Sequence, residues 1–238
     1  MRVNNVTAII DKFVENNGVT IHYLESLIDS VQTPLLYIPG MLGFAEQFKN
    51  EMEAFNDRKS YSISLRGNGK SAAPETGYSY EEQFTDLEAV IKDLKVEEFY
   101  LMSYSMGVPY AVQASIKYPQ KIKGLIICDY SPSIPKIPSG WAQSLIENDR
   151  IATDRRHVVK AIESELKSVD LTEELDKIQC PVLVMKGLKE GSLLKDEKLE
   201  EYRNRLENLK IVEFENSGHE LWHPDVEYFR DTIQNFMK

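Results

Sequence analysis

The stretch YLMSYSMGVPYA, residues 100–111, carries two serines between an apolar run and a helix-like pattern. The apolar run, FYLMS at residues 99–103, is typical of a strand that is buried on both faces. After the serines, Val108, Ala111 and Val112 repeat at the spacing of one helix face. The stretch therefore predicts a strand, a sharp turn and a helix in direct succession.

The turn itself indicates which serine is the candidate nucleophile. A strand-to-helix turn of this kind is so tight that the residues two before and two after its centre must be small. Around Ser105 these residues are Ser103 and Gly107, whereas around Ser103 one of them is the bulky Leu101. We therefore expect Ser105 at the tip of the turn. A serine hydroxyl is a weak nucleophile, so a base must lie beside it.

The rest of the chain alternates short apolar runs with helical patterns, which predicts an α/β fold with a mainly parallel sheet. The start of the chain differs, because FVENNGVTIHYLESL reads as two strands around a turn at Asn17-Gly18. We expect an antiparallel hairpin there, at the sheet edge. The strands predicted for the parallel part are residues 34–39, 61–65, 99–103, 124–129, 181–187 and 210–214.

Residues 131–178 interrupt this alternation. A proline-rich segment, SPSIPKIPSG, is followed by two helical patterns with no strand between them. We interpret residues 131–178 as a helical cap inserted into a single domain that spans residues 1–238. The alternative is that these helices are ordinary packing helices of the domain.

Composition limits the classes of partner. The chain has 238 residues, 42% of them hydrophobic, and a formal net charge of -10. An acidic protein is a poor ligand for nucleic acid, because phosphate binding needs a basic surface. No apolar run approaches the roughly 20 residues of a membrane span. We expect a cytoplasmic protein, a monomer or homodimer, that binds a small molecule and neither nucleic acid nor membrane.

Two motifs resemble known sites but fail on their context. RGNGKS, residues 66–71, ends like a phosphate-binding loop, but Ser64 stands where that motif needs glycine. HELWH, residues 219–223, matches a zinc signature that requires both histidines on one helix. Pro224 follows at once and disfavours the helical conformation for His223. We expect no metal and no cofactor.

Five segments in order resemble the α/β-hydrolase fold over nearly the whole chain. The elbow segment has Ser103 where glycine is usual, and serine is small enough to keep the geometry. The segments are LLYIPGMLGFAEQF for the oxyanion loop, RGNGKS for the loop after the next strand, SYSMG for the nucleophile elbow, PVLVMKGLKEGS for the strand before the acid and ENSGHE for the histidine loop. The resemblance implies an α/β-hydrolase fold with a mostly parallel central sheet.

The resemblance also implies roles for individual residues. Ser105 would attack an acyl carbonyl, and His219 would take its proton and return it to the leaving group. The backbone N–H groups of Met41 and Met106 would bind the oxyanion. Two residues are candidates for the acid that orients His219. Glu190, three residues after the end of the strand at 181–187, is preferred, and Asp129, at the end of the strand at 124–129, is the alternative.

Four further side chains are expected to form an apolar acyl pocket beneath the cap: Tyr130, Trp141, Leu145 and Trp222. The function this implies is a serine hydrolase, similar to carboxylesterases, that acts on a small ester, thioester or lactone. One alternative keeps the triad but cleaves a carbon–carbon bond or acts as a lyase. The other is a non-catalytic ligand-binding module, because a fold does not fix a function.

Overall fold

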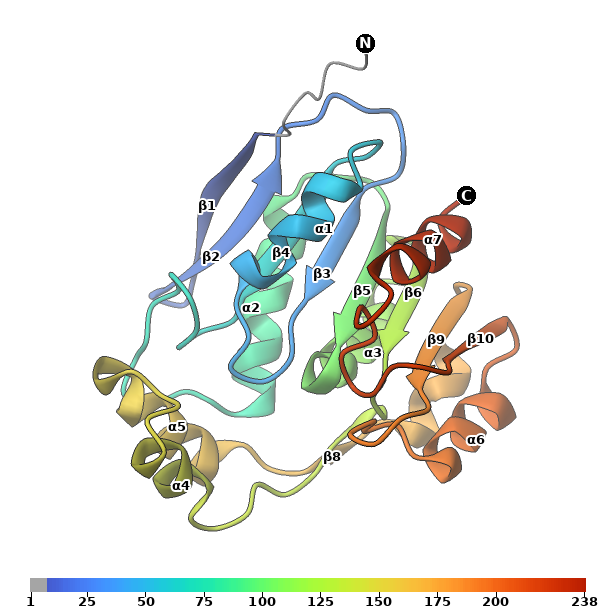
Figure 1. The fold of residues 1–238 in the computed structure, drawn as a ribbon. Helices are drawn as coiled ribbons and strands as arrows, with labels where there is room; N and C mark the ends of the chain where they lie inside the picture. The colour runs from blue at the N-terminus through green and yellow to red at the C-terminus, as the bar shows by residue number, and fades with distance from the viewer. Residues whose placement is uncertain (1–7) are drawn as a thin grey trace.

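A computed structural model describes residues 8–238 of the chain as an eight-stranded sheet with helices on both faces (Figure 1). The order across the sheet is β1-β2-β4-β3-β5-β6-β9-β10, and every pairing is parallel except β1 with β2 and β2 with β4. This confirms the mainly parallel sheet. The strands are β1 (Ile9–Asn16), β2 (Val19–Ser26), β3 (Leu35–Ile38), β4 (Ser60–Ser64), β5 (Phe99–Tyr104), β6 (Ile122–Cys128), β9 (Val182–Gly187) and β10 (Leu209–Phe214).

The hairpin of β1 and β2 forms one edge of the sheet, as predicted. Its two-residue turn consists of Asn17, with φ +51°, and Gly18, with φ +83°. A tight hairpin turn whose twist matches the strands needs positive φ at both central residues, and asparagine followed by glycine meets that need at little steric cost.

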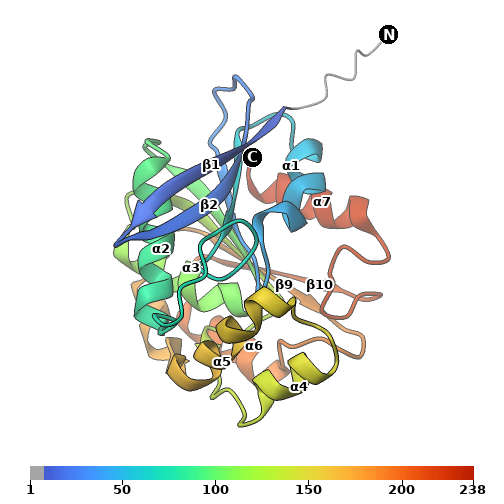
Figure 2. The same cartoon turned by 90° about the vertical axis from the view of Figure 1, so that its left-hand side faces the viewer.

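The central strands β3 and β5 are buried at nearly every position because helices cover both of their faces (Figure 2). One face packs against α1 (Lys49–Ala54) and α7 (Val226–Phe236), which contribute buried residues such as Met52 and Phe229. The opposite face packs against α2 (Tyr80–Asp93), α3 (Val108–Lys117) and α6 (Asp196–Arg205). The two hydrophobic clusters thus lie on opposite sides of one sheet.

The chain leaves the sheet between β6 and β9, where the cap was predicted. The helices α4 (Trp141–Glu147) and α5 (Arg156–Glu165) lie beyond the carboxyl ends of the parallel strands (Figure 1). They are flanked by a short antiparallel pair, β7 (Ser133–Ile134) with β8 (Val169–Asp170), which the sequence pattern did not predict. The end of the sheet at which ligands bind in open α/β folds is therefore the end that carries α4 and α5.

Across residues 8–238, no helix has both the length and the apolar character that a bilayer crossing requires.

Candidate active site

Ser105 lies at the turn between β5 and α3, and its backbone is strained. Its φ of +53° falls in the left-handed region, which residues other than glycine seldom adopt. The chain passes from Tyr104 through a single 3-10 turn, Ser105–Gly107, directly into α3, with Pro109 in the first turn of that helix. Such strain is concentrated at functional sites, where the surrounding packing enforces it. The predicted strand–turn–helix is confirmed.

The segment after β3 lies directly against this turn. A Cβ added to Gly107 would lie 2.5 Å from the Pro39 carbonyl oxygen, and one added to Gly40 would lie 2.8 Å from Ser105 Cβ. Both glycines are therefore needed for the two loops to touch. The approach brings Met41 and Met106 to the wall of one narrow cavity of about 20 Å³.

Ser103, two residues before Ser105, is fully buried, and its hydroxyl donates a weak 3.4 Å hydrogen bond to the Ile126 carbonyl oxygen. Replacing it by glycine should leave the reactivity of Ser105 close to wild type, because little is removed. Replacing it by leucine should abolish activity, because the larger side chain must displace the turn that holds Ser105. Kinetics with p-nitrophenyl acetate, normalised to folded protein, measure both effects. An active Ser103→Leu enzyme would contradict this account of the turn.

Asp129 follows β6 at the position that corresponds to that of Ser105 after the neighbouring strand, β5. Tyr104 and Cys128 are register partners in the β5–β6 pair, so Ser105 and Asp129 are each the next residue after the pairing. Asp129 also has a left-handed φ of +50°, and its side chain is fully buried. This placement at the end of two adjacent strands puts both residues at the carboxyl edge of the sheet.

The Asp129 carboxylate accepts four hydrogen bonds. Oδ1 accepts from Gly187 N at 3.1 Å and from Ser192 Oγ at 2.7 Å. Oδ2 accepts from Leu193 N at 2.9 Å and from His219 Nδ1 at 2.8 Å. The oxygens of a buried carboxylate must be satisfied by hydrogen-bond donors, and these four bonds do so. The same four bonds tie the turn after β9 and the histidine loop to the end of β6.

His219 lies in the loop between β10 and α7. Its ring stacks on Tyr104, the residue before Ser105 in the chain, with centroids 4.5 Å apart and an interplanar angle of 29°. With Nδ1 donating to Asp129, Nε2 is the nitrogen that is left to accept a proton. No hydrogen bond joins Ser105 Oγ to His219 within residues 8–238, and such bonds often tighten only when substrate binds.

The histidine loop approaches the end of β9 so closely that only glycine fits at two positions. A Cβ added to Gly187 would lie 2.1 Å from the Gly218 carbonyl oxygen. A Cβ added to Gly218 would lie 2.6 Å from the Glu190 carbonyl oxygen. Gly218, the residue before His219, must therefore be glycine, because any side chain there would collide with the backbone of the turn after β9.

The preference for Glu190 as the carboxylate beside His219 is wrong. Glu190 is exposed in the turn after β9, and its backbone, not its side chain, faces the histidine loop. That turn instead presents Ser192 and Leu193 to Asp129. The alternative stated from the sequence, Asp129, is the residue that contacts the imidazole.

The four predicted pocket residues do not come together. Tyr130 and Trp141 pack against the hydrophobic cluster on the α2–α3 side, Leu145 is half-buried on α4, and Trp222 packs on the opposite side of the sheet. None of the four lines the cavity beside Met41 and Met106. This expectation is therefore corrected.

Two cap side chains that sequence reasoning missed do line the narrow cavity: Ile162 of α5 and Leu166, the residue that ends it. Their four-residue spacing places them on one face of α5, together with the buried Val158. This apolar stripe was visible in the sequence. What the sequence does not show is that the stripe faces Met41 and Met106.

The two motifs that the sequence analysis rejected, HELWH and RGNGKS, both lie in loops. The HELWH segment is not helical, and α7 begins only at Val226, so His219 and His223 do not share a helix face. The RGNGKS segment opens no helix either. It is anchored by Arg66, which makes a buried bidentate ion pair with Asp86 at 2.7 and 2.8 Å.

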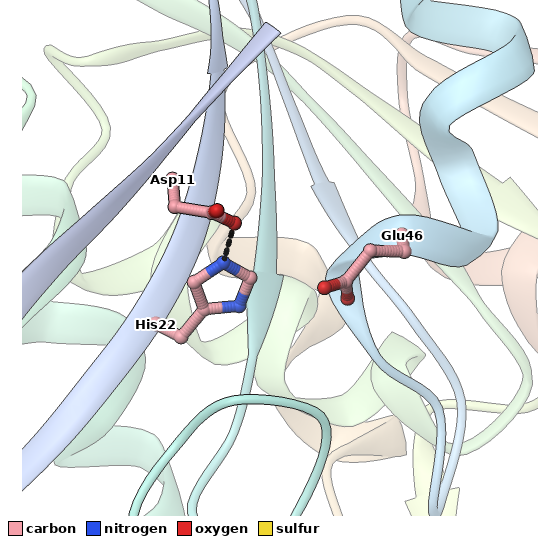
Figure 3. Close-up of side chains that lie close together, drawn as sticks. All are labelled: Asp11, His22 and Glu46. Atoms are coloured by element: carbon pink, nitrogen blue, oxygen red, sulfur yellow. Dashed lines mark hydrogen bonds and ion pairs between the residues drawn. The ribbon is translucent and has the colours of Figure 1, made fainter.

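Three side chains elsewhere could ligate a metal ion: Asp11, His22 and Glu46 (Figure 3). One ligand atom from each lies within 4.8 Å of the others, and His22 Nε2 is 2.8 Å from Asp11 Oδ1. Lys70 Nζ, however, lies 2.6 Å from Asp11 and 3.4 Å from Glu46. The hydrogen bond from Lys70, followed by that from His22, lowers the pKa of Asp11. Lys70 thus already supplies the positive charge that a metal ion would bring.

Comparison with known proteins identifies the family. A family profile described as alpha/beta hydrolase fold matches residues 33–161, and the chain belongs to this family. Its relatives include the 2-(acetamidomethylene)succinate hydrolase of Mesorhizobium japonicum, 29% identical over 101 residues, which covers 42% of this chain and 36% of that enzyme. They also include the AB hydrolase superfamily protein YisY of Bacillus subtilis, 23% identical over 85% of this chain and 91% of that protein.

The fold is shared with solved structures. An esterase from Exiguobacterium antarcticum superposes with a TM-score of 0.78 at 22% identity, covering 96% of this chain and 99% of the esterase. The α/β-hydrolase fold predicted from the sequence is confirmed. Membership of this family supports an enzyme.

Proposed function

We propose that this chain is a serine hydrolase that cleaves a small ester, thioester or lactone through an acyl-enzyme on Ser105. The observation that carries the proposal is the 2.8 Å contact of His219 Nδ1 with the buried Asp129, on a ring that stacks on Tyr104, the residue before Ser105. A nucleophile, a base and a carboxylate that orients the base are the three parts that this chemistry requires. The esterase that shares the fold adds support.

In the proposed reaction, Ser105 Oγ attacks the acyl carbonyl while His219 Nε2 takes the hydroxyl proton. The carbonyl oxygen becomes an oxyanion and accepts hydrogen bonds from the backbone N–H groups of Met41 and Met106. One such donor stabilises the transition state by roughly 2.7–4 kcal/mol. His219 then gives its proton to the leaving group. A water molecule, which gives a proton to His219 in the same way, then attacks the acyl-enzyme and releases the acid and free Ser105. Asp129 holds the imidazole in the tautomer that both steps need.

The cavity dimensions indicate which part of the substrate lies where. The narrow cavity beside Met41 and Met106, about 20 Å³, has room for little more than one water molecule. It shares Leu42 and Asn68 with an open cleft of about 470 Å³ along α5. We therefore propose that a short acyl group enters the narrow cavity and that the remainder of the substrate lies in the open cleft.

Rates for p-nitrophenyl esters of increasing acyl length test this proposal. We expect kcat/KM to be highest for acetate or propionate and to fall steadily toward octanoate, because a longer chain has no cavity to enter. Absence of hydrolysis for every ester would overturn the proposed function. A maximum at octanoate would keep the chemistry but contradict the assignment of the acyl cavity.

Shortening Leu166 to alanine should move this preference toward longer chains. The change removes methyl groups from the cavity wall, and one methylene in an apolar pocket changes discrimination by about 10- to 200-fold. The butyrate-to-acetate ratio of kcat/KM should rise about tenfold or more. Trp141→Ala is the matched control, because Trp141 also lies in the cap but not on this cavity. An equal shift in both variants would contradict the role of Leu166.

A further inference from the structure

A second cavity, of about 350 Å³, lies on the face of the sheet that α1 and α7 cover (Figure 1). Neither Ser105 nor Met41 and Met106 line it, so it is separate from the acyl site. Its walls come from β3, β5, β6, the α1 and α7 segments and the histidine loop, and they are formed by Tyr37, Gln47, Phe48, Asn50, Glu51, Met102, Tyr104, Cys128, Glu220, Trp222 and Phe229.

The inner walls of this cavity are largely aromatic. Tyr37 stacks on Phe48, with centroids 4.0 Å apart and an interplanar angle of 11°. Tyr104 meets the edge of Trp222, with centroids 5.1 Å apart. Rings held in this way lose little conformational entropy when a ligand binds, and the face of an aromatic ring carries the negative part of its quadrupole.

A polar group inside the cavity lacks a protein partner. Tyr37 is only 5% exposed, and its hydroxyl makes no hydrogen bond to any group within residues 8–238. Burial raises the pKa of this phenol well above its ordinary value, so the hydroxyl is neutral. The hydroxyl is not one of the fully buried side-chain atoms without a partner in residues 8–238, so it faces the open space of the cavity. It can therefore contact the hydroxyl group of a bound molecule without breaking a hydrogen bond within the protein.

The charged groups that line the cavity are both acidic. Glu51 is largely buried, and burial raises its pKa. Arg230 approaches Glu51 to 3.4 Å from α7 but does not itself line the cavity. Glu220 is exposed and forms no ion pair among the described residues. No lysine or arginine from residues 8–238 lines the cavity.

We propose that this cavity binds a small organic cation of the quaternary ammonium type. Its alkyl groups would pack on Phe48, Tyr104 and Trp222, and its charge would be balanced by Glu220, because Glu51 is already paired with Arg230. Aromatic walls with nearby carboxylates are the chemistry by which proteins recognise such cations. The volume exceeds that of choline, so choline is a suitable probe. The proposal is independent of the reaction proposed for Ser105.

Isothermal titration of the full chain with choline and with 3,3-dimethyl-1-butanol tests the proposal. The two molecules have nearly the same shape and differ in having a charged nitrogen or a neutral carbon. We expect choline to bind at least about tenfold more tightly, because a desolvated cation gains from the rings and carboxylates what the neutral molecule cannot. Equal affinities, or no binding of choline at millimolar concentration, would overturn the proposal.

Single-residue variants locate the bound cation. In Trp141→Phe, Trp222 is the sole tryptophan, and its emission should change with choline at the affinity found by titration. Glu220→Gln and Tyr37→Phe should each weaken choline binding several-fold. Glu215→Gln changes an exposed carboxylate off the cavity and should leave binding unaltered. Binding without a change in Trp222 emission, or an affinity unaffected by Glu220→Gln, would place the cation elsewhere and refute the assignment.

Discussion

Replacing Asp129 by asparagine should lower kcat for ester hydrolysis by a factor on the order of 10⁴, as the same change does in another serine hydrolase triad. The amide would present an N–H₂ group or a neutral oxygen to His219 Nδ1, and it would no longer hold the imidazole in the tautomer that leaves Nε2 free. The carboxylate also accepts from Gly187 N, Ser192 Oγ and Leu193 N, so stability should fall as well. Kinetics should therefore be measured on protein shown to be folded by circular dichroism.

The matched control is Glu190→Gln. Glu190 is exposed and lies only a few residues from Ser192 and Leu193, but its side chain does not contact the imidazole. We expect kcat within about twofold of wild type and an unchanged melting temperature. A nearly inactive Glu190→Gln with a normal Asp129→Asn would reverse the assignment of the acid and leave Ser105 and His219 in place.

Replacing Ser105 by alanine should remove essentially all catalysis, a loss on the order of 10⁶ in kcat where a triad nucleophile has been removed elsewhere. The protein should still fold, because alanine and serine have similar difficulty with the φ of +53° at this turn. Ser103→Gly is the control for a serine lost from the same turn. Residual turnover of Ser105→Ala near the wild-type rate would show that another residue performs the chemistry.

Much of the fold could be predicted because the sequence carries local signals for it. The strand that precedes Ser105, β5, and its neighbour β3 are buried on both faces and are therefore largely apolar in sequence. The hairpin turn has its own signal in Asn17-Gly18, since few other pairs adopt two positive φ angles. The small residues around Ser105 follow from the tightness of the turn, which local sequence also records.

The acid could not be chosen from the sequence, because the choice depends on the conformation of one turn. Glu190 and Asp129 both follow a strand at the carboxyl edge of the sheet, so position alone does not separate them. The turn after β9 folds with Gly191 at φ +93° and directs Ser192 and Leu193, rather than Glu190, toward the end of β6. The conformation of this turn thus decides which carboxylate reaches His219.

The prediction of the pocket residues was wrong for a related reason. Hydrophobic pattern identifies Trp141 and Trp222 as buried or half-buried, but it does not say on which side of the sheet each lies. Ile162 and Leu166 carry the same kind of signal and do reach the narrow cavity. Distinguishing the two pairs requires the orientation of α5 over the sheet, which depends on contacts between segments far apart in the chain.

Peptide mapping after reaction with a fluorophosphonate probe tests the central claim most directly, because the probe modifies only an activated serine. We predict one adduct per chain, located on Ser105, that is absent in Ser105→Ala and forms much more slowly in Asp129→Asn. An adduct on any other residue, or labelling of the Ser105→Ala protein at the wild-type rate, would contradict the account.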